Sequence, residues 1–353
     1  VGVGLGSRRP HPLSTLMLLR RPLLGAVACC VLALALRDAA SAVWLLAQLM
    51  HSIIPFRTTT AERLEAWAWR QWEEGGASST MPIQVPEVSA AAVWADLERP
   101  FIVRGLLDGA AALENRSWLR APPVGELLVP YYSDASGGAL RPDAVGTVAR
   151  VVAAIEAGGP QKLGTELVFR RHPELLTELG LTAPLARLFG RSPFEPRRLG
   201  TTLTVPLFLG TGATDGATHV RTDFHAEPIG SATLQLGGRK KWTLIPGGQS
   251  YRLRPSLAPD GRAFFCTRRA HGAAGVATLA AAGATHYQVE QRPGDVLWVP
   301  TWTWHRVDYL PNVTALSVSL FHVRAEQLAA AQPLLTAAMV PALLKELVGW
   351  KTQ

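Results

Sequence analysis

Cysteine is scarce in this chain and poorly placed for cross-linking. The 353 residues include three cysteines, and two of them, Cys29 and Cys30, are adjacent in an apolar run near the N-terminus. Neither a CxxC pair nor the paired spacing of a zinc ribbon accompanies Cys266. The sequence therefore predicts no disulfide framework and no cysteine-based zinc site, and cysteine usage leaves the redox compartment open.

Long charged runs are also missing. Charged residues make up 18% of the chain and hydrophobic residues 48%, which excludes a chain that is disordered throughout. The formal net charge is +8, but half of it comes from residues 1–42, where five arginines oppose one aspartate. The other basic residues occur in short clusters, such as residues 239–241. Because no extended basic stretch is present, we expect no nucleic-acid partner.

No apolar run reaches the length of a typical membrane span, yet the N-terminus resembles a targeting signal. Residues 23–36 are apolar, follow two arginines and precede an A-x-A triplet at residues 40–42, which are the three parts of a secretory signal. A second apolar segment at residues 43–54 follows. We therefore predict that residues 1–60 are a signal peptide or signal anchor with a linker. This places the protein in the secretory pathway, lumenal or held in the membrane by that segment, with an organellar presequence as the alternative.

Helical patterns precede a β-rich region and return after it. Helices are predicted at residues 61–74, 145–157 and 172–181, and a short strand at residues 100–105. After residue 200, short β-rich runs alternate with Gly and Pro turns at residues 201–209, 231–236, 241–245, 287–291, 295–299 and 315–321. We predict a mainly β fold with flanking helices, in the form of a sandwich or barrel. The domain would span residues 85–325, with its core at about 200–322, and a helical tail would occupy residues 326–353.

One histidine and one glutamate stand two residues apart at His225 and Glu227. On an extended strand, side chains at positions i and i+2 point to the same side, so both could reach one ion. With a distant histidine they would form a 2-His-1-carboxylate triad, which leaves three positions of Fe(II) open for a chelating cosubstrate and oxygen. Because an H-x-E pair alone arises often by chance, the third ligand decides the interpretation.

His305 is the candidate third ligand. It follows a Pro-Gly-Asp turn at residues 293–295 and an apolar strand, and it lies in a tryptophan-rich segment. Such a position suits a ligand in a dry pocket, although a core histidine with a satisfied hydrogen bond is the alternative. His219 and Asp223 also precede His225, but the residue two positions after His219 is an arginine, and Asp223-x-His225 reverses the usual order. We expect both to lie outside the ligand set.

Four motifs occur in a fixed order across residues 200–322. They are His225-x-Glu227, the GRKKWTLIP segment at residues 238–246, Pro-Gly-Asp at residues 293–295, and Trp304-His305. Together they resemble the JmjC-type, cupin-like 2-oxoglutarate oxygenases, in particular their asparaginyl-hydroxylase branch. The resemblance implies a double-stranded β-helix, or jelly-roll, barrel of the JmjC type.

The resemblance also implies roles for individual residues. The residues that match the iron ligands are His225, Glu227 and His305. Lys240 matches the lysine that pairs with the distal carboxylate of 2-oxoglutarate, and Thr222 matches the hydroxyl that supports the same group. Ser319 falls where that branch often has an asparagine near the cosubstrate. Strand alternation puts Lys240 and Lys241 on opposite faces without choosing between them, so the choice of Lys240 rests on the resemblance.

The function that the resemblance implies is an Fe(II)- and 2-oxoglutarate-dependent oxygenase that uses molecular oxygen to hydroxylate a protein side chain. Lysine demethylation is less favoured, because no chromatin-reading module or nuclear signal is visible. Two other hypotheses stay open. One is a cupin without oxygenase activity, which binds a glycan or protein partner or holds another metal. The other is a membrane-anchored scaffold. By analogy, residues 325–350 could form a homodimer interface.

Overall fold

The computed structural model describes residues 38–53, 58–73, 81–92, 96–107, 115–182, 201–212, 220–258, 262–272, 274–324, 327–328 and 331–347. The first apolar stretch with Cys29 and Cys30, and also His219, lie outside these described residues.

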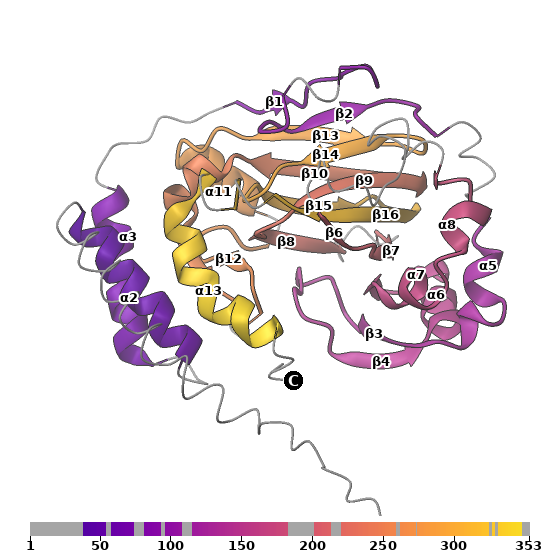
Figure 1. Cartoon of the computed structure of the whole chain (residues 1–353), viewed down its shortest axis with the longest axis horizontal. Helices are drawn as coiled ribbons and strands as arrows, with labels where there is room; N and C mark the ends of the chain where they lie inside the picture. The colour runs from indigo at the N-terminus through magenta and orange to yellow at the C-terminus, as the bar shows by residue number, and fades with distance from the viewer. Residues whose placement is uncertain are drawn as a thin grey trace, which may run out of the picture.

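Two large sheets make up most of the molecule (Figure 1). The seven-stranded sheet has the order β1-β13-β10-β15-β8-β12-β11, and the nine-stranded sheet has the order β2-β14-β9-β16-β7-β5-β3-β4, with β6 paired to β16. All pairings are antiparallel except that of β1 with β13. The mainly β fold with flanking helices is therefore confirmed, while the described strands form open sheets rather than a closed barrel.

The bounds of the elements follow the chain. The strands are β1 Ile83–Gln84, β2 Phe101–Val103, β3 Leu128–Tyr132, β4 Ala144–Thr147, β5 Lys162–Thr165, β6 Thr201–Thr204, β7 Leu207–Thr211, β8 Arg221–Ala226, β9 Gly230–Gly237, β10 Lys240–Ile245, β11 Pro255–Leu257, β12 Phe265–Thr267, β13 Tyr287–Gln291, β14 Val296–Val299, β15 Trp304–Tyr309 and β16 Thr314–Val323. The helices are α2 Ala39–Ile53, α3 Thr59–Glu73, α5 Ser117–Arg120, α6 Val148–Glu156, α7 Leu167–Arg171, α8 Leu175–Glu178, α11 Gly275–Ala281 and α13 Pro333–Leu347, with short 3₁₀ turns at Val124–Glu126 and Gly247–Leu253.

Two of the predicted helices differ in extent from the structure. The helix expected from residue 145 begins at Val148, because the preceding residues form β4 and pair with β3. Thr147 then caps α6 by accepting a hydrogen bond from the Arg150 N–H. The helix expected at residues 172–181 is reduced to the four residues of α8. By contrast, α3 agrees closely with its prediction and is capped by Thr58, whose hydroxyl accepts from the Ala61 N–H at 3.2 Å.

The outer face of the nine-stranded sheet is apolar, and α5 to α8 pack against it (Figure 1). In α6 the buried residues recur at helical spacing, at Val148, Val151, Val152 and Ile155. They pack with outward-facing side chains of the sheet, such as Leu234 on β9. This helical layer buries the outward face of the nine-stranded sheet.

A second helical layer, formed by α2, α3 and α13, covers the outer face of the seven-stranded sheet (Figure 1). Trp44 on α2 is fully buried, packs 5.7 Å from Phe265 and donates its indole N–H to the Pro255 carbonyl at 2.9 Å. Gln48 accepts from the Leu257 N–H at 2.8 Å. These contacts make α2 a packed part of the described fold. Among the described helices, none combines the length and apolarity needed to cross a bilayer.

The inner face of the nine-stranded sheet shows the opposite polarity in its central strands. On β9 and β16 most outward residues are apolar, whereas the alternate, inward ones include several hydroxyl and amide side chains beside Ala315 and Phe321. The inward polar side chains are Ser231, Thr233, Gln235, Ser317 and Ser319, all of them buried. Buried hydroxyls need partners, so these strands put hydrogen-bonding groups into the space between the sheets.

Candidate metal centre

A cavity of about 330 Å³ lies between the two sheets. Its walls combine residues of β8, β10 and β15 with residues of β5, β9 and β16. All six residues singled out as site candidates line it: Thr222, His225, Glu227, Lys240, His305 and Ser319. Residues that are more than 80 positions apart in the sequence thus meet in one space.

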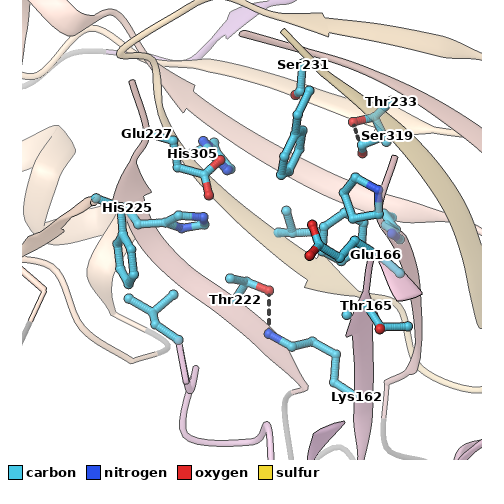
Figure 2. A pocket seen from close by; sticks show the side chains of 18 of the residues that line it. Lys162, Thr165, Glu166, Thr222, His225, Glu227, Ser231, Thr233, His305 and Ser319 are labelled. Atoms are coloured by element: carbon cyan, nitrogen blue, oxygen red, sulfur yellow. Dashed lines mark hydrogen bonds between the residues drawn. The ribbon is translucent and has the colours of Figure 1, made fainter. Parts of the chain in front are cut away.

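His225, Glu227 and His305 gather at one end of this cavity (Figure 2). Each can offer one ligand atom, and the three atoms lie within 4.8 Å of one another. His225 and His305 are opposite partners on β8 and β15, and their ring centroids are 4.1 Å apart. Glu227 follows just after the end of β8. Of the His, Cys, Asp and Glu residues in the described chain, this is the one group that could hold a metal ion.

Backbone carbonyls fix which nitrogen each histidine presents. The Nδ1 of His225 lies 2.9 Å from the Asp223 carbonyl, and the Nδ1 of His305 lies 3.0 Å from the Thr303 carbonyl. Because a carbonyl oxygen can only accept, each Nδ1 carries the hydrogen and each Nε2 keeps a free lone pair. This arrangement orients both rings for a metal ligated through Nε2.

Burial keeps both imidazoles neutral. Desolvation, followed by the neighbouring charge of His305, lowers the pKa of His225 well below its ordinary value. Desolvation also lowers the pKa of His305 to about 4. A metal binds the neutral form of histidine, so these shifts favour ligation at neutral pH.

An irregularity in β8 brings Thr222 to the same side as His225. The register with β15 pairs His305 with His225 but Val307 with Thr222, so three steps on β8 match two on β15. Such a bulge inserts one extra residue and re-aims side chains. Thr222 therefore faces the cavity even though it lies three residues before the histidine.

Asp223, beside Thr222, points away from the cavity. Its carboxylate accepts from the Arg221 guanidinium at 2.9 Å and lies 3.9 Å from that of Arg306. Its side chain does not take part in the metal cluster, although its carbonyl orients His225. A buried carboxylate between two guanidinium groups is a structural ion pair, and it lies on the face of β8 opposite to the cavity.

The tryptophan-rich turn before β15 anchors Glu227. The N–H of Trp302 donates to the Glu227 carbonyl at 3.0 Å, and its indole N–H donates to the Leu328 carbonyl at 3.0 Å. Trp302 has a φ of 63°, an uncommon backbone conformation for a non-glycine residue, and its side chain is fully buried. Trp302 thus connects the start of β15, the strand of His305, to Glu227.

The far end of the cavity contains Lys240. Its side chain is 1% exposed, and its ammonium donates to the Ser317 hydroxyl at 2.5 Å across the gap between the sheets. Lys241, its neighbour, is exposed to solvent. Ser319 shares a 2.7 Å hydrogen bond with Thr233, and both line the same wall (Figure 2). The structure thus puts Lys240 rather than Lys241 inside the cavity.

Lys162, Arg262 and Phe264 are among the cavity residues that went unnoticed in the sequence. Lys162 on β5 donates to the Thr222 hydroxyl at 2.9 Å (Figure 2). Phe264 packs edge-on to His225, with the two ring centroids 5.9 Å apart. The guanidinium of Arg262 lies 4.7 Å from the centre of the Phe264 ring. A four-residue strand and a loop carry these residues, and neither has a periodicity or motif that could have marked them.

The donor set fits a divalent transition metal such as Fe(II). Two imidazole nitrogens and one carboxylate within 4.8 Å of one another match the donor types of the 2-His-1-carboxylate pattern. No protein-family model and no curated protein matches this chain. The resemblance to the JmjC-type oxygenases therefore stays a prediction from the four sequence motifs.

Proposed function

We propose that this protein is an Fe(II)- and 2-oxoglutarate-dependent oxygenase that hydroxylates a protein side chain. The observation that carries the proposal is the convergence of His225, Glu227 and His305 at one end of a cavity whose far end contains a buried lysine. A cation site and an anion site in the same enclosed space suit a metal-chelating dicarboxylate. The protein substrate is proposed on the family resemblance.

The same proposal extends to the fold. Two facing antiparallel sheets, with the candidate ligands on neighbouring strands of one sheet, are compatible with a double-stranded β-helix of the JmjC type. The order of the ligand strands also agrees, since β8 carries the H-x-E pair and β15 the second histidine. This assignment is supported by topology and motif order together.

The chain's own residues would prepare the reaction in three ways. His225 and His305 offer neutral nitrogens, and Glu227 supplies one negative charge to the metal. Lys240 would bind the distal carboxylate, which orients the cosubstrate. The enclosing walls limit access of water to the site. When bound, iron with 2-oxoglutarate would supply oxidising power from oxygen, giving succinate, carbon dioxide and a hydroxylated C–H bond.

The test measures both binding and turnover in the full chain. Protein prepared without oxygen would receive Fe(II) and 2-oxoglutarate, and succinate would be measured after air is admitted. We expect uncoupled succinate formation that disappears in His225→Ala and Glu227→Gln. Glu166→Gln is the matched control, because Glu166 lines the same cavity but lies outside the metal cluster.

Each result has a defined meaning. Succinate formation that depends on Glu227 but not on Glu166 would support the oxygenase. Metal binding without any 2-oxoglutarate binding by calorimetry would reject it and leave the cupin without oxygenase activity, which holds another metal or binds a partner. Absence of metal binding at His225, Glu227 and His305 would reject the oxygenase and the metal-holding cupin, and would leave the cupin that binds a glycan or protein partner.

A further inference from the structure

Two buried lysines cross the cavity in opposite directions. Lys162 extends from β5 of the nine-stranded sheet and donates to the Thr222 hydroxyl on β8 of the seven-stranded sheet at 2.9 Å. Lys240 extends from β10 of the seven-stranded sheet and donates to the Ser317 hydroxyl on β16 of the nine-stranded sheet at 2.5 Å. Each ammonium group thus crosses the gap and reaches a hydroxyl of the opposite sheet.

Neither lysine has an ion-pair partner in the described part of the chain. Lys162 is 2% exposed and Lys240 is 1% exposed. Their hydrogen-bond acceptors are neutral: the Ala139 carbonyl and the Thr222 hydroxyl for Lys162, and the Ser317 hydroxyl for Lys240. The ammonium of Lys162 lies 3.8 Å from the centre of the Tyr132 ring, and the more distant charges of Asp223 and Arg262 act on it with opposite sign. An ammonium has three donors, so both keep N–H groups for a further acceptor.

The arrangement is costly if its purpose is only to join the sheets. Burial lowers the pKa of each lysine to about 7, which records the free energy needed to keep a charge in this space. Apolar side chains would join two sheets without that penalty. Lysines placed in a cavity with spare donors therefore indicate an anion that binds between them.

The position of this lysine pair matches a ligand anchored at the metal cluster. Thr222, the hydrogen-bond partner of Lys162, pairs with Val307, which lies two residues along β15 from His305. Thr222 is therefore on the order of 7 Å along the strand from the pair His225 and His305. Lys240 pairs with Tyr309, which lies two residues beyond Val307 on β15. The distance to the Thr222 row is within the reach of a five-carbon dicarboxylate that chelates a metal at the cluster. Lys240 starts two residues farther along, and the charge of Lys162 lowers its pKa, so the two ammonium groups lie near one another.

We propose that Lys162 and Lys240 bind the distal carboxylate together, one oxygen facing each ammonium, and that Lys162 determines specificity for a dicarboxylate. This inference rests on the proposed function and adds a residue to it. Thr222 then has two roles, because it holds Lys162 in place and also faces the same carboxylate. Two lysines from different sheets would also clamp the sheets around the bound cosubstrate.

The test compares two ligands that differ only at the distal end. Calorimetry on the full chain, with Mn(II) in place of Fe(II), would measure affinities for 2-oxoglutarate and for 2-oxopentanoate, in which a methyl group replaces the distal carboxylate. The variants are Lys162→Met, Lys162→Gln, Lys240→Met and the double Met variant. Lys241→Met is the matched control, because it removes a lysine from the same strand but from its exposed face.

We expect Lys162→Met and Lys240→Met each to lose at least about tenfold in affinity for 2-oxoglutarate, as for one charge-assisted hydrogen bond. Affinity for 2-oxopentanoate should stay unchanged in both. The double variant should lose less than the product of the two single losses, because both lysines act on one carboxylate. Lys162→Gln keeps a donor for Thr222 and removes only the charge, so it tests the charge even if the Met variant folds poorly.

The outcomes separate this inference from the proposed function. If the unmodified protein with Mn(II) does not prefer 2-oxoglutarate over 2-oxopentanoate, the proposed function fails and this inference fails with it. If the unmodified protein shows the preference and Lys162→Gln keeps it in full, the function stands and the two-lysine site is rejected. A preference lost in Lys162→Gln and kept in Lys241→Met supports the site.

Discussion

The two ends of the cavity respond in opposite ways to the same burial. At the proposed metal end, formed by His225, Glu227 and His305, desolvation lowers the pKa of both histidines, which would leave neutral nitrogens for an ion. At the lysine end, desolvation lowers the pKa of both ammonium groups to about 7, which works against the charge that an anion needs. The first end would therefore be ready for a metal ion at neutral pH, while the second would have to gain protons as an anion binds.

The largest expected effect is the loss of metal affinity when one ligand of the proposed metal end is removed. His225→Ala or His305→Ala should weaken metal binding at least about 100-fold, more than the loss of a supporting hydrogen bond, because it removes one of three ligands. Calorimetry with Mn(II) measures the loss, and a thermal melt of the metal-free variant checks the fold. His322→Ala removes a buried histidine outside the cluster and is the control. Equal losses in all three variants would show that the cluster is not the metal site.

The metal end was the part that the sequence predicted best. His225 and Glu227 are close in sequence, and the strand that carries them converts an i, i+2 spacing into a shared face. His305 needed a second motif, the Pro-Gly-Asp turn with its buried strand, and the antiparallel pairing of β15 with β8 then completes the group. Strand periodicity therefore explains the shared face of His225 and Glu227, while the choice of His305 rested on the four motifs together.

The lysine end was only half predictable. Lys240 was singled out by resemblance, because alternation alone could not separate it from Lys241. Lys162 lies 63 positions before His225, on a strand of four residues whose place beside β7 and β3 depends on long-range pairing. The reach of Thr222 into the cavity depends on a bulge, which no periodic pattern reports.

Several elements of the fold were also hidden for the same reason. The segment that begins at residue 145 has a helical pattern, yet its first residues form β4 because β3 offers a pairing partner. Likewise α2 lies in a region assigned to targeting and linker sequence, and its packing on β11 and α13 needs contacts with residues some 200 or more positions away. Propensity describes a segment alone, while these outcomes depend on its neighbours.

The second prediction tests whether the two ends cooperate. Removing metal with a chelator should lower affinity for 2-oxoglutarate on the order of 5- to 150-fold, the usual range of coupling between two sites. Affinity for succinate, which has no 2-oxo group to chelate, should change little. By reciprocity, 2-oxoglutarate should tighten metal binding by the same factor. Equal effects on succinate and 2-oxoglutarate would mean that metal acts through the fold and not through the ligand.

The third prediction concerns pH and the lysine end. Since the lysines of the free cavity have pKa values of about 7, a rise in pH above 7 deprotonates them, and 2-oxoglutarate must then bring protons with it. Affinity should therefore fall as pH rises, by up to about tenfold per pH unit for each lysine. Calorimetry in buffers of different ionisation enthalpy measures the proton uptake directly. The histidines, with lowered pKa values, stay neutral throughout and contribute nothing to this slope.

The lysine variants sharpen this measurement. Lys162→Met or Lys240→Met should reduce the slope and the proton uptake, while Lys241→Met should leave both intact, because Lys241 is exposed. A flat pH profile in the unmodified protein would mean that the lysines are charged before ligand binds.

The smallest expected effect is on the stability of the ligand-free protein. In the unfolded chain both lysines regain an ordinary pKa near 10.5, so between pH 7 and pH 9 the unfolded state binds more protons than the folded state. The free energy of unfolding should therefore rise with pH in this window, by at most about 1.4 kcal/mol per pH unit for each lysine. Burial raises the pKa of Tyr309, which has the opposite effect once tyrosines of the unfolded chain ionise, so the window ends below pH 10. Urea unfolding of the ligand-free protein and of the double Met variant would measure this slope. A steeper or equal slope in the variant would show that the buried lysines are not its source.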